Sequence, residues 1–116
     1  MEDNRYIEVL YKSPRKKPKR ILIENTLEDM QKLVNGYIQI VRYKDALLVC
    51  NEERKMRNLE PNVMFKNDII CGSFFLVGDD YKNADFISLS EKQIKKYKKE
   101  LSADIQIDYE MECEFD

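Results

Sequence analysis

One polar loop carries side chains suited to binding a ligand. The segment CNEERKMRNLEPN delivers Asn51, Glu52 and Glu53 directly after an apolar run and closes at Asn62. Binding residues concentrate on loops that a rigid scaffold holds in place, so loop 51–62 is a candidate site for a small molecule or nucleotide. The alternative is structural: Asn51 supports the turn through its side chain, and the glutamates are solvated.

A second polar loop, GDDYKN, contributes Asp79, Asp80 and Tyr81. Two adjacent carboxylates suit a hard cation, but the D-x-D-x-D-G spacing of a calcium loop is missing and the composition is also typical of a turn. We therefore expect no metal and no cofactor. Loops 51–62 and 79–81 together define one functional alternative, a small-molecule or nucleotide-binding module.

Several classes of catalytic site are excluded by residue type. The chain has no histidine, which removes Ser-His-Asp, Cys-His and His-zinc chemistry. Its three cysteines form no C-x-x-C pair, and P-loop, G-x-G-x-x-G and G-x-S-x-G motifs are missing. We predict no catalytic residues and expect a protein that is not an enzyme.

Basic side chains gather near the N-terminus, where they suggest phosphate contacts. They are Lys12, Arg15, Lys16, Lys17, Lys19 and Arg20. A DNA-associated regulator is therefore a further alternative. The sequence pI of about 5.3 is far below that of typical nucleic-acid-binding domains, so we expect a solvated basic loop and no nucleic-acid partner.

The last stretch, ADIQIDYEMECEFD, alternates apolar and polar residues without a break, which predicts a half-buried strand with an acidic face. The simplest role of that face is contact with water. Alternatively, it meets a basic partner, and an exposed strand of this kind could also join two copies into a homodimer. The candidate partner-binding residues are Asp108, Glu110, Glu112 and Glu114.

The elements that position these side chains follow from hydrophobic spacing. We expect two N-terminal strands, RYIEVLYK and RILIEN, joined by the basic loop. A helix should follow, with Thr26 as its N-cap and Gly36 just past its end. The strands YIQIVRY and ALLVCN then flank Lys44 and Asp45, the length of a tight hairpin.

The second half of the chain is expected to hold the centre of the sheet. Because of Pro61, EERKMRNLEPNVMFKND predicts a long loop with a helical turn. The run DIICGSFFLVG predicts a buried central strand with a bulge at Gly72 and Ser73, and GDDYKNADF predicts a loop. Ser88 or Ser90 should cap a lysine-rich helix over EKQIKKYKKEL, before the acidic last strand.

This order predicts one α+β domain over residues 1–116, since 116 residues with 43% apolar content can bury a single core. The expected architecture is a mainly antiparallel sheet of five to six strands. Two helices pack on it and cover one side, and the long acidic strand ends the chain. No segment reaches the length of a membrane span, so no membrane association is expected.

Four motifs in order resemble a family of small proteins of unknown function, encoded by bacteriophages and mobile elements of Gram-positive bacteria. They are TLEDMQKLVNGYIQIV, ALLVCNEERKMRNLEPN, DIICGSFFLVG and DFISLSEKQIKKY, within residues 5–98. Arg54 departs from the pattern, because many relatives have glycine there. The resemblance implies a phage or mobile-element protein in the cytoplasm of a bacterial host, and it supplies no activity or catalytic residues.

Together these observations favour a small, non-enzymatic protein that inhibits or sequesters a component of bacterial host defence by binding. Its partner would be a host protein or protein complex. The ligand-binding module and the DNA-associated regulator remain the alternatives.

Overall fold

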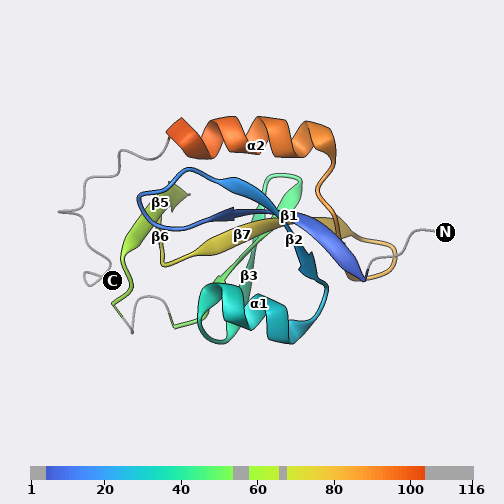
Figure 1. The fold of residues 1–116 in the computed structure, drawn as a ribbon, viewed down its shortest axis with the longest axis horizontal. Helices are drawn as coiled ribbons and strands as arrows, with labels where there is room; N and C mark the ends of the chain where they lie inside the picture. Colours follow the sequence, from blue (N-terminus) through green and yellow to red (C-terminus); the bar gives the residue numbers. More distant parts are fainter. Residues whose placement is uncertain (1–4, 54–57, 66–67, 104–116) are drawn as a thin grey trace.

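The computed structural model describes residues 5–53, 58–65 and 68–103. This part of the chain forms eight strands and two helices, and Figure 1 shows how they are arranged. In chain order they are β1 (Tyr6–Lys12), β2 (Lys19–Glu24), α1 (Leu27–Val34), β3 (Ile38–Tyr43), β4 (Ala46–Asn51), β5 (Pro61–Phe65), β6 (Asp68–Cys71), β7 (Phe74–Asp80), β8 (Asp85–Ile87) and α2 (Glu91–Ala103). Neither helix is long and apolar enough to cross a membrane.

The main sheet is antiparallel and has six strands in the order β2-β1-β7-β4-β3, with β8 paired to β7. β7 is central, as expected from the run FFLVG, and its residues Phe74–Gly78 are all buried. Strands β5 and β6 form a separate two-stranded sheet. The predicted α+β fold with an antiparallel sheet is therefore confirmed for the described residues.

The two helices lie on opposite faces of the sheet, so the expectation that they cover one side is wrong (Figure 1). Phe74 and Leu76 of β7 pack in the cluster that includes Tyr97 of α2. The alternate residues Phe75 and Val77 pack in the cluster that includes α1. A strand that is apolar at every position requires cover on both faces, and this continuous run places one helix on each side.

Three other local expectations differ from the structure. Pro61 begins β5, because proline is tolerated as the first residue of a strand. The run DIICGSFFLVG is two strands in different sheets, separated at Gly72, whose φ of 78° favours glycine. The expected loop GDDYKNADF is a hairpin of β7 and β8. The predicted acidic strand lies outside the described residues.

The helix starts follow the sequence closely. Thr26 is the N-cap of α1, and its Oγ1 accepts a hydrogen bond from the Asp29 backbone amide at 3.2 Å. Ser90 and Gln93 exchange reciprocal bonds of 3.1 and 2.9 Å at the start of α2. Side-chain caps of this kind satisfy backbone amides that the first turn leaves without a partner.

Candidate functional site

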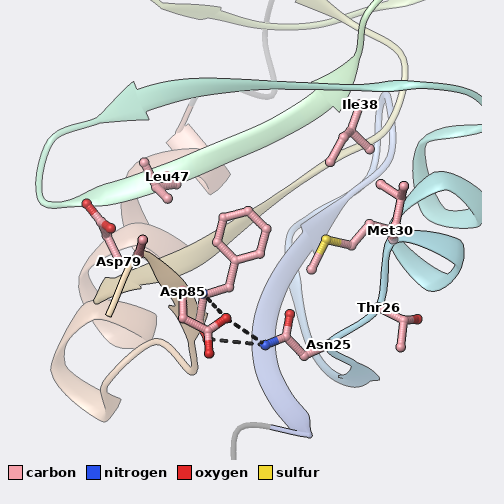
Figure 2. Close-up of a pocket in the computed structure, with 10 residues that line it drawn as sticks. Asn25, Thr26, Met30, Ile38, Leu47, Asp79 and Asp85 are labelled. Atoms are coloured by element: carbon pink, nitrogen blue, oxygen red, sulfur yellow. Dashed lines mark hydrogen bonds between the residues drawn. The ribbon is translucent and has the colours of Figure 1, made fainter. Parts of the chain in front are cut away.

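A cleft of about 400 Å³ opens where the start of α1 faces the β7–β8 hairpin. We call it the α1-side cleft (Figure 2). Its lining comes from the β2–α1 connection, α1, β3, β4, β7 and the β8 region, elements that are distant in sequence. The ten lining residues are Asn25, Thr26, Leu27, Met30, Ile38, Leu47, Asp79, Ala84, Asp85 and Phe86.

The interior of the cleft is apolar. Met30 is buried, Ile38 and Leu47 are half-buried, and all three line the cleft (Figure 2). They meet because Ile38 and Leu47 stand on the α1 face of the sheet, and Met30 is on the helix face that packs there. Such a cavity has the size and chemistry of a site that binds an apolar group.

Hydrogen bonds join the two sides of the cleft at its polar rim. Asn25 Nδ2 donates to Asp85 Oδ1 and to the Phe86 carbonyl oxygen, both at 3.3 Å. The Phe86 backbone amide donates to the same Asp85 oxygen at 2.7 Å. These contacts fix Asp85 and tie β8 to the residues that precede α1 (Figure 2).

An ion pair holds the other acidic side chain of the rim. Arg42 of β3 donates to Asp79 Oδ2 at 2.6 Å, and its guanidinium lies 5.4 Å from the ring centre of Tyr81. The hydrogen bond that Arg42 donates to Asp79 raises the pKa of Arg42, which therefore stays positively charged. Only 13% of the Asp79 side chain is exposed, so the neighbouring residues and the ion pair restrict its movement.

Exposed apolar side chains lie at the mouth of the cleft, on β3 and on the turn between β7 and β8. Leu27 at its mouth is 57% exposed, Ile40 on β3 is 47% exposed, and Tyr81 beside Arg42 is 72% exposed. Ile40 pairs with Val49 and therefore stands on the same sheet face as the cleft. We call the cleft together with Leu27, Ile40 and Tyr81 the α1-side surface.

Comparison with known proteins places the chain in a family. The model of a domain of unknown function, DUF3846, matches residues 7–102. The chain belongs to the DUF3846 family. The expectation of a family of unknown function is thus confirmed. The DUF3846 chain matches none of the curated proteins and none of the solved structures with which it was compared.

Two of the predicted ligand residues of this DUF3846 chain are buried and bond to the backbone. Asn51 Nδ2 donates to the carbonyl oxygens of Val34 and Asn35 at 2.9 and 3.2 Å, at the end of α1. Its Oδ1 accepts from the Glu53 amide at 2.7 Å. This is the structural role weighed for Asn51.

Asn62 makes a second buried junction. Its Nδ2 donates to the carbonyl oxygens of Lys12 and Gly72 at 3.0 and 2.8 Å. Its Oδ1 accepts from Lys12 Nζ at 2.5 Å. The amide therefore joins β5 to the end of β1 and to the link between β6 and β7, which accounts for its burial.

The other predicted ligand residues are near the surface. Glu52 and Glu53 are exposed. Asp80 accepts a hydrogen bond from Asn83 Nδ2 at 2.7 Å, which lowers the pKa of the Asp80 carboxyl and stabilises the β7–β8 turn. Of the seven predicted ligand residues, Asp79 alone lines the α1-side cleft.

The six basic residues that the sequence analysis grouped together do not form one cluster, because several of them bind different partners within the protein. Lys12 is buried on Asn62, and Arg15 forms an ion pair with Glu60 at 2.5 Å.

Arg20 donates to Glu8 of β1 and to Glu91 of α2. Both contacts raise the pKa of Arg20, and the same bonds lower the pKa of each glutamate. Lys16 and Lys17 of the loop and Lys19 at the start of β2 are exposed.

Within residues 5–53, 58–65 and 68–103, no group of three or more Cys, Asp or Glu residues could hold a metal ion. The acidic residues Asp108, Glu110, Glu112 and Glu114 lie outside that part of the chain. No sequence motif marks Asn25, Met30 or Phe86 as residues of the cleft. Each belongs to a different segment, and only the position of α1 over the sheet brings them together.

Proposed function

We propose that this DUF3846 protein is a non-enzymatic binding protein whose α1-side surface holds a partner protein. The observation that carries the proposal is an apolar cleft on the same side of the sheet as three exposed apolar side chains, Leu27, Ile40 and Tyr81. Contiguous exposed apolar surface is a hallmark of interaction sites. A cleft within such a surface can receive an anchoring side chain of the partner.

The composition of the surface supports this role. Tyrosine, methionine and arginine are enriched at protein interfaces, and Tyr81, Met30 and Arg42 all belong to the surface or contact it. The Arg42–Asp79 ion pair and the Asn25–Asp85 hydrogen bond hold its polar groups in place before a partner arrives. Such preorganisation reduces the entropy lost on binding.

The charged groups beside the cleft suit binding better than proton transfer. A general acid or base works best with a pKa near the working pH. The hydrogen bond to Asp79 instead raises the pKa of Arg42, so that Arg42 keeps its positive charge through the neutral range. Groups that keep one charge through the neutral range can orient a partner without exchanging protons.

The resemblance of the four sequence motifs supports a biological context for this proposal. The protein would be encoded by a phage or mobile element and would act in the cytoplasm of its bacterial host. Its partner would be a component of host defence, inhibited or sequestered when the α1-side surface covers it. Binding alone is sufficient for such an effect.

A pull-down from a bacterial host lysate tests the proposal. The test variant combines Leu27→Asp with Ile40→Thr, two exposed changes that leave the core intact. The control is Leu22→Thr, an exposed residue that pairs with Glu8 on the opposite, α2-side face. Wild type and control should recover the same partner, and the test variant about tenfold less of it, as expected for the loss of about 1.4 kcal/mol of binding.

Equal recovery by all three proteins would contradict the α1-side surface. Recovery of a partner unrelated to host defence would contradict the biological context and leave the binding surface standing. Far-UV circular dichroism of each variant checks that the fold is retained.

A small-molecule ligand is the second candidate, favoured by the volume of the cleft. About 400 Å³ falls within the range of small-molecule sites. Native mass spectrometry of the protein purified from a bacterial host would detect a retained ligand. A spectrum of the protein mass alone, together with no thermal shift from a nucleotide panel, would contradict this candidate.

A further inference from the structure

We infer that the α1-side cleft recognises a protein segment in which a basic side chain lies close to an apolar anchor. This inference rests on the proposed function and specifies the chemistry of the partner. The apolar anchor enters the hollow between Met30 and Leu47, and the lysine or arginine binds the carboxylate of Asp85 at the rim.

The charge of the lining gives the first reason. Its ten residues include two acids, Asp79 and Asp85, and no base. A partner that covers the cleft removes water from these carboxylates, and a desolvated carboxylate is costly unless it gains a hydrogen-bond donor or an opposite charge. Arg42 already supplies one to Asp79. Asp85 has hydrogen-bond donors but forms no ion pair within the described residues, so its opposite charge comes from the partner.

The hydrogen bonds of Asp85 give the second reason. Both bonds, from Asn25 Nδ2 and from the Phe86 amide, end on Oδ1. No residue of the described segments donates to Oδ2. The carboxylate is thus held in one orientation with an acceptor oxygen available, and a charge-assisted bond to lysine or arginine is the strongest that it can accept.

The positions of the exposed apolar side chains favour a protein segment over a small cationic molecule as the ligand. A small molecule within the cleft would leave Ile40 and Tyr81 in water, because neither lines it. A chain that crosses the cleft can cover both. Because the hollow and the Asp85 rim adjoin, the apolar and basic side chains of that segment must also lie close together.

A random peptide library displayed on yeast tests the inference with purified full-length protein as the probe. Peptides enriched by wild type should carry lysine or arginine close to a large apolar residue. Their binding should weaken about tenfold in Asp85→Asn, which keeps an amide oxygen for Asn25 and Phe86 but lacks the charge. Asp80→Asn is the matched control, since Asp80 bonds Asn83 and does not line the cleft.

Four results would overturn the inference: no enriched peptide, enriched peptides without a basic residue, equal binding by Asp85→Asn, or equal weakening by Asp80→Asn. The Leu27→Asp, Ile40→Thr variant separates these results from failure of the proposed function. Peptides that lack a basic residue but lose binding to this variant would remove only the charge requirement. Peptides that bind it as well as wild type would contradict the α1-side surface itself.

Discussion

Two buried asparagine side chains join segments of this protein by hydrogen bonds to the backbone. Asn51 closes the end of α1 onto β4. Asn62 joins β5 to β1 and to Gly72. Each satisfies backbone carbonyl groups that burial would otherwise leave without donors. The sequence marks both residues as unusual, but asparagine in a polar segment has the same appearance whether it binds a ligand or the backbone.

Asn62→Ala should therefore reduce stability. The substitution removes the hydrogen bonds to the Lys12 and Gly72 carbonyl oxygens and the bond from Lys12 Nζ. We expect the free energy of unfolding to fall by about 2 kcal/mol, because the remaining buried groups lose a partner. Urea unfolding measures the change. Glu53→Ala, an exposed substitution in the same predicted ligand set, is the control, and equal stability of both variants would contradict the structural role of Asn62.

Because of Tyr97, the stability of the folded protein should depend on pH in the alkaline range. Its ring is fully buried, and its hydroxyl donates to Asp45. Burial, and then this hydrogen bond, raise the pKa of Tyr97 from 10.0 to about 12. The folded state thus binds the phenolic proton more tightly than the unfolded state does. The resulting stabilisation is complete below pH 10 and is lost as the pH rises towards 12.

Tyr97→Phe should cost about 1 kcal/mol at neutral pH, the usual net value of one hydrogen bond. It should also make stability less sensitive to pH between 10 and 12. Chemical unfolding of both proteins across this range measures the difference, which cancels the titration of the other tyrosines. A constant difference at every pH would show that Tyr97 does not contribute to the alkaline loss.

At the scale of elements, β8 is held unusually close to β7. A Cβ atom at Gly78 would lie 2.7 Å from the Ser88 carbonyl oxygen and 2.8 Å from that of Ile87. Only glycine allows this approach. Since β8 carries Asp85 and Phe86, the spacing between these two strands also sets the position of one wall of the α1-side cleft.

Gly78→Ala should displace β8. We expect a loss of about 1 to 3 kcal/mol in the free energy of unfolding, the usual cost of overpacking. Partner recovery should fall as well, because the wall formed by Asp85 and Phe86 moves. Urea unfolding and the lysate pull-down measure the two effects. Unchanged stability would contradict the close approach of the strands.

The sequence predicted correctly those helices and strands that are marked by a short motif, such as a helix cap or an apolar run. Thr26 and Ser90 marked the helix starts, and the run FFLVG marked the central strand. Strand pairing that depends on a partner strand was not predicted. Pro61 begins a strand because β6 lies beside it, and Asp85 pairs with Asp80 across a turn of polar residues. The cleft has the same origin, since its walls come from segments whose packing no short motif encodes.

At the scale of the whole molecule, the sheet separates two surfaces of different chemistry. The α2 side carries the exposed lysines of that helix, and the α1 side carries the cleft with its acidic rim. Two helices on opposite faces thus bury the apolar run Phe74–Gly78 of β7, and Leu27, Ile40 and Tyr81 stay exposed on the α1 side. The acidic C-terminal segment is a third candidate surface, and it competes with the cleft as the origin of partner binding.

Neutralising that segment decides between the two surfaces. The variant carries Asp108→Asn, Glu110→Gln, Glu112→Gln and Glu114→Gln. If the partner binds the α1-side surface, the lysate pull-down should recover it in wild-type amount, because the cleft and its rim are unchanged. If the acidic C-terminal segment binds a basic partner, the variant would instead lose several favourable charge interactions. Recovery would then fall most clearly at low salt, where screening is weakest. Wild-type recovery by the neutralised variant, with loss of recovery in the Leu27→Asp, Ile40→Thr variant, would place binding at the cleft. The reverse result would place binding at the acidic C-terminal segment.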